Sequence, residues 1–445
     1  MVESHTHFPT TNYPGPKFDR VKLFEDTDRD GKPGRISAFA DGSHNALNLA
    51  FGQDGGEGST ESCPADVGHL YVTHRNGVLR LDDKDGDGVS ESRATILEMD
   101  TPASYPHNGI SGIAFSHDDW LYVGQGHNLG ERYTLKGTDG TTHSGKGEGG
   151  SIFRCRPDGS RLQLVATGFW NLFGLAFYGK HFLLAEDNDP DSRPPNRLLD
   201  VVMCGDYGFK YRLGRNGLHP FQSWNGELPG SLPMLSGASE GACNILPCDQ
   251  TSFPSGYREA ILVTAAWDHR VEVHRPKPFG ASRRADHEVL VQGDESFRPV
   301  GIATASASDG SLYLTDWVDA SYNVHGKGRL LRLMAKTGTR AKPGTALTIA
   351  VNASRRKMER LSGAGFPELQ SALVHNDPFV RSAAITALSK PAFRDAVENE
   401  LENKSPEVRL GALLALRRVG SEDAGVIVSK MLANPDEPVR RMALV

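Results

Sequence analysis

The chain has 445 residues, of which 38% are hydrophobic and 23% charged, a composition that favours a folded protein over a disordered one. Lys and Arg total 49 against 55 Asp and Glu, so the formal net charge is −6, which disfavours a nucleic-acid partner. No apolar run reaches the roughly 18 residues that a transmembrane helix needs. The N-terminal segment shows no pattern of a secretory signal.

The composition changes sharply along the chain. Residues 1–350 contain 44 of the 49 Gly, 32 of the 35 aromatic residues and 15 of the 16 His. We therefore expect two domains of different class: a β domain over residues 1–335, a linker over 336–350 and a helical domain over 351–445.

The first 335 residues repeat a pattern of strands. RVKLFEDTDRDGKPGRISAFA from Arg20 and GVLRLDDKDGDGVSESRATIL from Gly77 each read as a strand, an acidic Gly-containing loop and a second strand, which indicates a hairpin. Looser hairpins start at Ser151 and Arg270. Between the hairpins, a pair of apolar strands recurs from about residues 48, 112, 174, 242 and 301.

A unit of four strands that repeats about every sixty residues is typical of a β-propeller blade. The sequence therefore predicts an all-β six-bladed propeller whose first blade lacks its opening strands. Because Met1 stands so close to the first hairpin, we expect either that the natural chain extends further at this end or that the ring closes in an unusual way.

The last 95 residues repeat a helical pattern. DPFVRSAAITAL from Asp377, SPEVRLGALLAL from Ser405 and EPVRRMALV from Glu437 align with one another, and the first two begin with an N-cap residue followed by Pro. This pattern predicts an all-α, HEAT-like solenoid, in which each unit buries its apolar face against its neighbours. The third copy stops within its helix, so we expect further sequence at this end also.

Three polar residues occupy the same position in different blades. His107 in PHNGISGIAF, Asn171 in FWNLFGLAF and Arg298 in FRPVGIATA each stand just before an inner strand. Residues in this register point toward a common channel, which is the arrangement that a site needs. The alternative is that each one makes a hydrogen bond that caps a loop between blades.

Two acidic loops match the chemistry of a calcium site. One loop contains Asp26, Asp28 and Asp30, and the other contains Asp83, Asp85, Asp87 and Glu91. Alternating carboxylates before a Gly can wrap oxygen ligands around Ca²⁺, and the second loop is the stronger candidate. The alternative is a solvated acidic turn. A transition metal at His5 and His7, in the HTH cluster, is less favoured.

The blade motifs PHNGISGIAF, TGFWNLFGLAF, AEDND, GDYGF and FRPVGIA resemble those of soluble quinoprotein glucose/sorbosone dehydrogenases. The resemblance is closer to the propeller of large bacterial membrane-bound-dehydrogenase proteins, in which HEAT-like repeats follow and a c-type cytochrome module often ends the chain. It implies hydride abstraction from a sugar or alcohol onto pyrroloquinoline quinone (PQQ), with Ca²⁺ as a second cofactor. It also implies a cytochrome as electron acceptor and a periplasmic or secreted location.

The resemblance also implies roles for individual residues. His107 matches the general base that takes the hydroxyl proton. Asn171 and Arg298 match positions that hold the oxygens and carboxylates of the quinone. Asp187 and Asp189 lie where the family places its calcium and quinone contacts.

Two residues depart from the family pattern. Trp170 replaces an Arg that precedes the matching Asn, and His127 replaces an acid that supports the catalytic His. Trp170 can stack on a sugar or a cofactor ring, or it can form part of the channel wall. A non-catalytic propeller and HEAT module that binds carbohydrate or protein therefore remains an alternative. A lactonase-type hydrolase with acids around a metal is a further one, although no residue singles it out.

Overall fold

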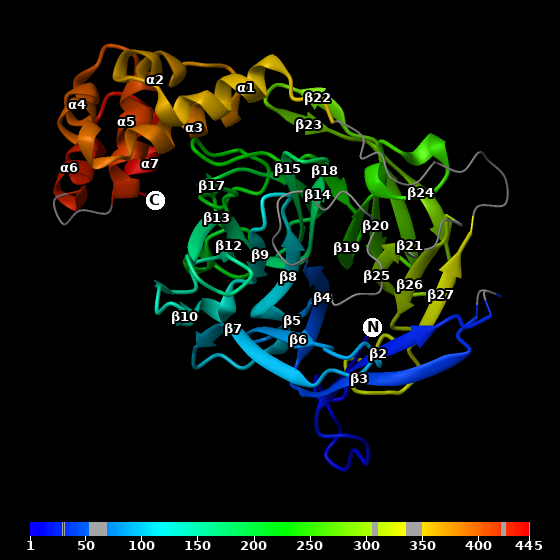
Figure 1. Ribbon diagram of the computed structural model, residues 1–445. Helices are drawn as coiled ribbons and strands as arrows, with labels where there is room; N and C mark the ends of the chain where they lie inside the picture. Colours follow the sequence, from blue (N-terminus) through cyan, green and yellow to red (C-terminus); the bar gives the residue numbers. More distant parts are fainter. Residues whose placement is uncertain are drawn as a thin grey trace.

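The computed structural model describes residues 1–28, 30, 32–52, 69–304, 310–334, 349–419 and 424–444. They form a six-bladed β-propeller followed by a helical solenoid packed against its outer side, which confirms the predicted fold class (Figure 1). Antiparallel pairing joins neighbouring strands in every blade, apart from one short parallel pair at the outer edge of the third.

The first blade has three strands, as the short N-terminal repeat predicts. They are β1 (Val2–Glu3), β2 (Asp19–Glu25) and β3 (Arg35–Ser43). The second blade contains β4 (Ala46–Gly52), β5 (His69–His74), β6 (Gly77–Asp82), β7 (Ser92–Asp100), β10 (Tyr133–Gly137) and β11 (Thr142–Gly145). The third contains β8 (Ile110–Phe115), β9 (Leu121–Gln125), β12 (Gly150–Cys155), β13 (Gln163–Phe169) and β17 (Gly205–Asp206).

The remaining blades follow in chain order. The fourth contains β14 (Asn171–Tyr178), β15 (Phe182–Asn188), β16 (Asn196–Val201) and β18 (Ser236–Ala238). The fifth contains β19 (Ala242–Pro247), β20 (Ile261–Ala265), β21 (Arg270–His274) and β24 (His287–Gln292), with the hairpin β22 (Lys277–Phe279) and β23 (Ser282–Arg284) inserted. The sixth contains β25 (Pro299–Thr304), β26 (Leu312–Asp316) and β27 (Arg329–Leu333).

The inner strands β4, β8, β14, β19 and β25 surround the central channel, and they begin close to the repeat positions predicted from sequence (Figure 1). Glycines let these strands approach one another. A Cβ added at Gly112 would lie 2.9 Å from the Leu175 side chain, and one at Gly174 would lie 3.2 Å from the Asn244 backbone. The recurrent Gly of the inner-strand motif is therefore a packing requirement of the ring.

The solenoid contains α1 (Ala353–Arg360), α2 (Phe366–Ala372), α3 (Pro378–Leu388), α4 (Arg394–Asn399), α5 (Pro406–Val419), α6 (Ala424–Lys430) and α7 (Glu437–Leu444). The aligned helices α3, α5 and α7 stack in sequence. In each, the aligned Arg donates to two carbonyls of the preceding loop; these residues are Arg381, Arg409 and Arg440. The repeat is thus preserved in its hydrogen bonds as well as in its buried apolar positions.

A buried ion pair fixes the solenoid to the fourth blade. Arg355 of α1 donates to Asp200 of β16 at 3.1 Å, and Ser282 of β23 donates to the same carboxylate at 2.8 Å. Asp377, the N-cap of α3, also accepts the backbone N–H of Ala281 at 2.5 Å. Because these side chains lie in the interface, the helices and the propeller share one continuous packed boundary.

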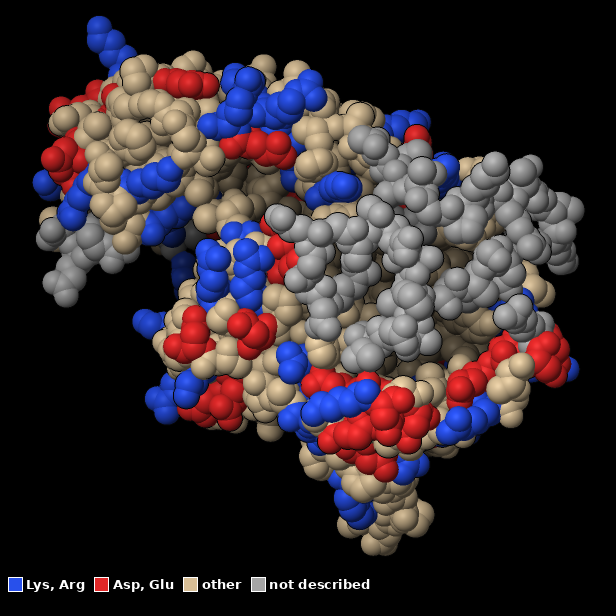
Figure 2. All heavy atoms as spheres, in the orientation of Figure 1, with Lys and Arg blue, Asp and Glu red and all other residues tan. Residues whose placement is uncertain are grey.

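The described helices contain no segment long and apolar enough to cross a membrane. Figure 2 shows Asp and Glu side chains gathered over the edge formed by β2 and β3, whereas Lys and Arg are scattered over the helices and the remaining visible face.

Candidate functional site

A cavity of about 1940 Å³ follows the channel between the inner strands and the N-terminal segment. Its aromatic lining includes Tyr105, Trp170, Phe173, Trp267, Trp317 and Tyr322. Its polar lining includes His107, Asn171, Asn188, Asp189, Asp191, Arg215 and Glu240. The structure therefore brings seven of the residues singled out from sequence to one cavity: His5, His7, Asp26, His107, Trp170, Asn171 and Asp189.

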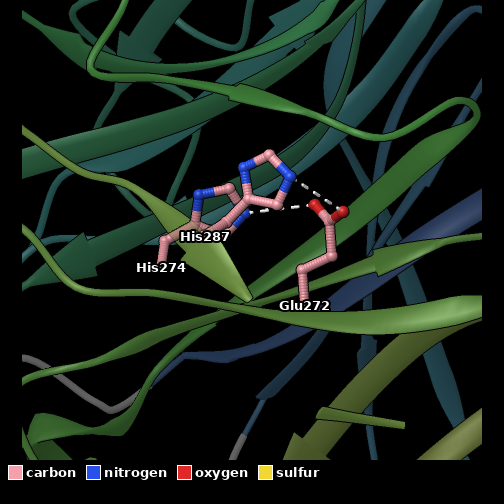
Figure 3. A group of neighbouring side chains, drawn as sticks. All are labelled: Glu272, His274 and His287. Atoms are coloured by element: carbon pink, nitrogen blue, oxygen red, sulfur yellow. Dashed lines mark hydrogen bonds and ion pairs between the residues drawn. The ribbon is translucent and has the colours of Figure 1, made fainter. Parts of the chain in front are cut away.

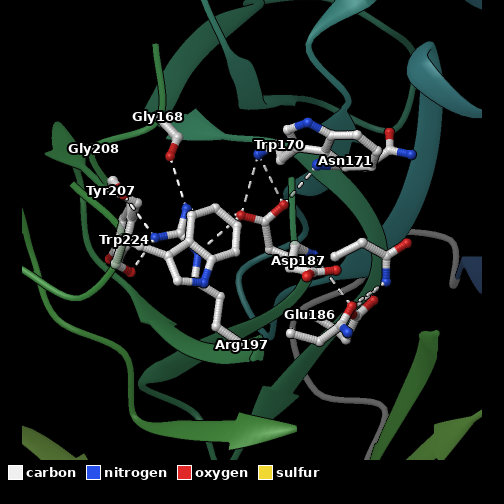
Figure 4. A network of polar contacts seen from close by, with 12 residues as sticks. Gly168, Trp170, Asn171, Glu186, Asp187, Arg197, Tyr207, Gly208 and Trp224 are labelled. Carbon is white, nitrogen blue, oxygen red and sulfur yellow. Dashed lines mark hydrogen bonds and ion pairs between the residues drawn. The ribbon is translucent and has the colours of Figure 1, made fainter. Parts of the chain in front are cut away.

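The start of β14 places Trp170 and Asn171 in the wall of this cavity. Asp187, on the neighbouring strand β15, accepts the backbone N–H of Asn171 at 2.7 Å and that of Trp170 at 3.0 Å (Figure 4). A single carboxylate thus holds the backbone of both residues while their side chains face the channel.

Arg197 of β16 holds Asp187 in turn. Its guanidinium donates to Asp187 Oδ2 from Nε at 3.0 Å and from Nη2 at 2.8 Å, and both side chains are fully buried (Figure 4). The same guanidinium donates to the carbonyls of Gly168, Tyr207 and Trp224. It also lies 3.6 Å from the centre of the Trp224 ring. This network is a rigid support behind the channel wall.

Two polar atoms in the wall lack hydrogen-bond partners. Within the described part of the chain, Asn171 Oδ1 and Trp170 Nε1 are buried and have no hydrogen-bond partner. A Cβ added at Gly126 would lie 2.2 Å from Asn171 Oδ1, so Gly126 leaves the space that this amide occupies. Buried polar atoms normally have partners, and a hydroxyl-bearing ligand that reached this part of the wall would supply the missing ones.

His107 lines the cavity among other rings. Its Nε2 contacts Nε2 of His7, and the two rings stack with their centres 4.3 Å apart. The Tyr322 ring lies 5.1 Å away, and Tyr105 Oη lies 3.4 Å from His107 Nδ1. Burial, assisted by the neighbouring His7, lowers the pKa of His107 to about 3. The imidazole is therefore neutral at pH 7.

His127 is fully buried behind the cavity, at the position where the resemblance implies an acid. Its Nδ1 accepts the backbone N–H of Leu129 at 3.1 Å, and its Nε2 lies 2.9 Å from the Asn108 amide. Burial and the charge of Arg215 lower its pKa to about 3. A neutral, hydrogen-bonded imidazole is a structural support and supplies no negative charge to His107.

Acidic residues dominate one side of the cavity. Burial raises the pKa of Asp189, and burial together with the nearby Asp189 raises the pKa of Glu240. Asp191 lies on the same side, 3.5 Å from Arg215. Arg215 thus balances one of the three carboxylates, so the wall around Trp170 and Asn171 keeps an excess of carboxylates.

Two other predicted residues lie outside the cavity lining. Asp187 is occupied by Arg197 and by the two backbone donors described above. Arg298 is buried, and its guanidinium packs 4.8 Å from the centre of the Trp267 ring. Its backbone N–H donates to Asp316 at 2.8 Å. Both residues support residues that line the channel.

The acidic loops place their carboxylates close together. One oxygen each from Asp83, Asp85, Asp87 and Glu91 lies within 4.8 Å of the others, and the same holds for Asp26, Asp28 and Asp30. Several of these oxygens accept backbone N–H groups of the loop itself, as Asp83 does from Gly86 and Gly88. A calcium site there stays a prediction.

Sequence reasoning missed several contacts and residues that shape the site. His7 was singled out only as a metal candidate with His5, and its contact with His107, 100 positions away, has no local sequence signal. Arg197 and the fully buried Glu186, whose pKa burial raises, follow from the pairing of β14, β15 and β16. The polar run AEDND of β15 was the one sequence feature that could have pointed to them.

The comparisons with known proteins agree with this two-part organisation. The family model described as "Domain of unknown function (DUF7133)" matches residues 2–321. The chain belongs to this DUF7133 family. A model for HEAT repeats matches residues 367–445, which include the helices from α3 to α7 of the DUF7133 protein. A search of curated proteins gave no match.

Solved structures similar to this DUF7133 protein include sugar dehydrogenases. An oxidoreductase (glucose dehydrogenase) from Thermus thermophilus is 20% identical, with a TM-score of 0.49 over 75% of this chain and 99% of the other. The PQQ-bound aldose sugar dehydrogenase of Streptomyces coelicolor is 19% identical, with a TM-score of 0.47 over 75% and 97%. The PQQ domain of a pyranose dehydrogenase from Coprinopsis cinerea is 10% identical, with a TM-score of 0.43 over 67% and 85%. These similarities assign no activity to the chain.

Proposed function

We propose that the channel of the propeller binds a sugar or another polyhydroxy alcohol. The observation that carries this proposal is the wall formed by Trp170 and Asn171, in which an aromatic ring that borders the cavity lies beside a buried amide oxygen without a hydrogen-bond partner. An aromatic face packs against the C–H face of a sugar ring, while amide and carboxylate oxygens accept its hydroxyl groups. The further aromatic rings of the lining extend this combination around the cavity.

The charge of the wall narrows the substrate class. Asp189, Asp191 and Glu240 lie on the same side of the cavity as Arg215, while the cavity is also lined by Lys22, Lys32, Arg329 and Arg332. Carboxylates accept hydroxyl and ammonium donors and repel anions. We therefore expect neutral sugars and amino sugars to bind, and uronic acids to be excluded.

The residues around this wall do not fit PQQ. PQQ is a planar quinone that carries several carboxylates, and such a group needs cations in its site. The Arg implied by the family pattern is Trp170 here, and Arg298 packs behind Trp267 instead of lining the cavity. Beside Trp170, the carboxylates of Asp189, Asp191 and Glu240 outnumber the single cation Arg215, which would oppose a polyanion at this wall. No step through the quinone is therefore derived.

Oxidation of the bound sugar by a PQQ-type dehydrogenase mechanism is the second candidate. One observation favours it: His107 lines the cavity and is neutral, which is the protonation state that a general base requires. Its low pKa limits its strength as a base. The contact with His7 also occupies the nitrogen that would face a substrate.

Isothermal titration calorimetry with a panel of glucose, glucosamine, sorbitol and glucuronate tests the proposal. We expect binding of the first three and none of glucuronate. Trp170→Ala should weaken binding at least roughly tenfold through the lost aromatic contact. Phe279→Ala is the control, because Phe279 is an exposed ring on β22 outside the cavity lining. Equal binding by both variants would contradict the proposal.

Dye reduction by glucose in the presence of added PQQ and Ca²⁺ tests the second candidate. Reduction that is lost in His107→Asn would establish a dehydrogenase. Binding without reduction would favour the first candidate. A cytochrome acceptor and a periplasmic or secreted location are proposals that accompany the dehydrogenase, whereas a protein partner on the helical surface accompanies the binding module.

A further inference from the structure

A second group of ligating side chains lies in the fifth blade, outside the cavity lining. Glu272 and His274 of β21 are fully buried, and His287 of β24 is 36% exposed. His274 and His287 are direct partners in the β21–β24 pairing, so their side chains project on the same side of the sheet. Figure 3 shows both imidazoles directed toward the Glu272 carboxylate.

The three groups converge on one small volume. His274 Nε2 lies 3.3 Å from Glu272 Oε2, and His287 Nε2 lies 3.4 Å from Glu272 Oε1. One ligand atom from each residue lies within 4.8 Å of the others. In a tetrahedral zinc site with metal–ligand bonds of about 2.05 Å, ligand atoms are about 3.4 Å apart. The observed spacing therefore suits a zinc-sized cation.

One hydrogen-bond arrangement of His274 leaves its Nε2 without a proton. Ser236 Oγ lies 2.9 Å from the Gly237 carbonyl oxygen and 3.1 Å from His274 Nδ1, so when the hydroxyl donates to that carbonyl its oxygen accepts from Nδ1. The proton of the neutral ring is then on Nδ1, and the Nε2 lone pair faces a carboxylate oxygen. Two such groups repel each other unless a cation lies between them.

The surroundings of Glu272 resemble the outer shell of a metal site. Ser239 donates to the carboxylate from both its hydroxyl and its backbone N–H, and Arg270 Nε lies 3.2 Å from Oε1. These groups fix the orientation of the carboxylate, as partners of metal-bound carboxylates do. Oε1 accepts the Ser239 hydroxyl proton, and Oε2 accepts the Ser239 backbone N–H while it faces His274.

We propose that Glu272, His274 and His287 bind a divalent transition-metal ion of the zinc class. Two imidazoles and one carboxylate are borderline ligands that suit Zn²⁺ and disfavour Ca²⁺ and Mg²⁺. Because His287 is partly exposed, the ion can enter the site from solvent, and water can occupy the remaining coordination position of the ion. The site would join the outer strands β21 and β24 of the fifth blade.

Titration of the chelator-treated full chain with ZnSO₄ tests the site, with Co²⁺ absorption as a second readout. We expect the wild type to bind Zn²⁺, and we expect His287→Ala to lower the affinity for Zn²⁺ at least roughly 100-fold and to remove the Co²⁺ absorption bands. His287 is the best position to change because its partial exposure allows the variant to fold. A circular dichroism melt of the variant checks this directly.

Two control variants separate this site from other imidazoles. His117→Ala removes an exposed His from a turn of the third blade, and His7→Ala removes the imidazole that contacts His107. Both variants should bind Zn²⁺ at the Glu272–His274–His287 site as the wild type does. Absence of Zn²⁺ binding in the wild type would overturn the proposal, as would binding that survives His287→Ala or is lost in His7→Ala. A further outcome would also overturn the proposal: a ¹⁵N spectrum that shows His274 as a cationic imidazole and does not change when Zn²⁺ is added. In that case a proton would take the place of the metal.

Discussion

Replacing Arg197 with Met removes the support behind the Trp170–Asn171 wall. The substitution deletes both bonds to Asp187 and the donors to the Tyr207 and Trp224 carbonyls, while the Gly168 carbonyl still accepts the Phe209 N–H and a similar side-chain volume is kept. Each buried carbonyl without a donor costs about 1 kcal/mol at the low end of its range, and an uncompensated buried carboxylate costs about 3 kcal/mol. With partial relaxation, we expect the free energy of unfolding of the propeller to fall by roughly 5 kcal/mol, a large part of a domain's stability.

Urea unfolding followed by tryptophan fluorescence measures this loss, because all five tryptophans lie in the propeller and none in the solenoid. Arg193→Met is the matched control. Arg193 pairs with Glu227 at 2.7 Å, but both side chains are partly exposed, so we expect a loss below about 1 kcal/mol. The double variant Arg197→Met/Asp187→Asn should lose less than the two single changes together, since neither charge is left alone. If Arg197→Met costs no more than Arg193→Met, the account of the buried network is wrong.

Three further predictions follow from the interface, the buried imidazoles and the acidic loops. Arg355→Met should leave the buried Asp200 without its ion-pair partner and lower the stability of the solenoid–propeller contact by about 3 kcal/mol in a thermal melt. Arg360→Met, at an exposed position of the same helix, should change this stability little. The free energy of unfolding should rise with pH between about 4 and 6.5. In the unfolded chain His127 takes up a proton near pH 6.5, whereas burial keeps the pKa of its imidazole in the folded protein at about 3. Urea midpoints that fall with pH over this window would contradict this prediction. Millimolar Ca²⁺ should raise the melting temperature of the wild type and not of Asp85→Asn, and equal shifts would exclude a calcium site in that loop.

The repeats explain how much of the fold the sequence could predict. Inner strands recur because each blade needs the same apolar strand beside the channel, and the aligned Arg409 recurs because each HEAT unit has the same loop carbonyls to satisfy. Asn171 and His107 were found for the same reason, since their register within a repeat places them at the channel. Periodicity therefore predicts what every unit shares.

Contacts between unlike units could not be predicted in this way. His7 reaches His107 from the N-terminal segment of the first blade, which breaks the repeat. The alignment of His274 with His287 depends on an inserted hairpin, β22–β23, which hides their pairing in the sequence. Arg298 has the register of a channel residue, but the Trp267 ring takes the position in front of it. Each of these depends on side-chain packing between blades, which no repeat encodes.

A crystal structure of the chain soaked with the tightest-binding neutral sugar tests the central proposal most directly. We predict density for a sugar ring against the face of Trp170, with one hydroxyl within hydrogen-bond distance of Asn171 Oδ1 and another close to Asp189 or Glu240. Density on the outside of the blades, or an empty channel at saturating sugar, would contradict the account.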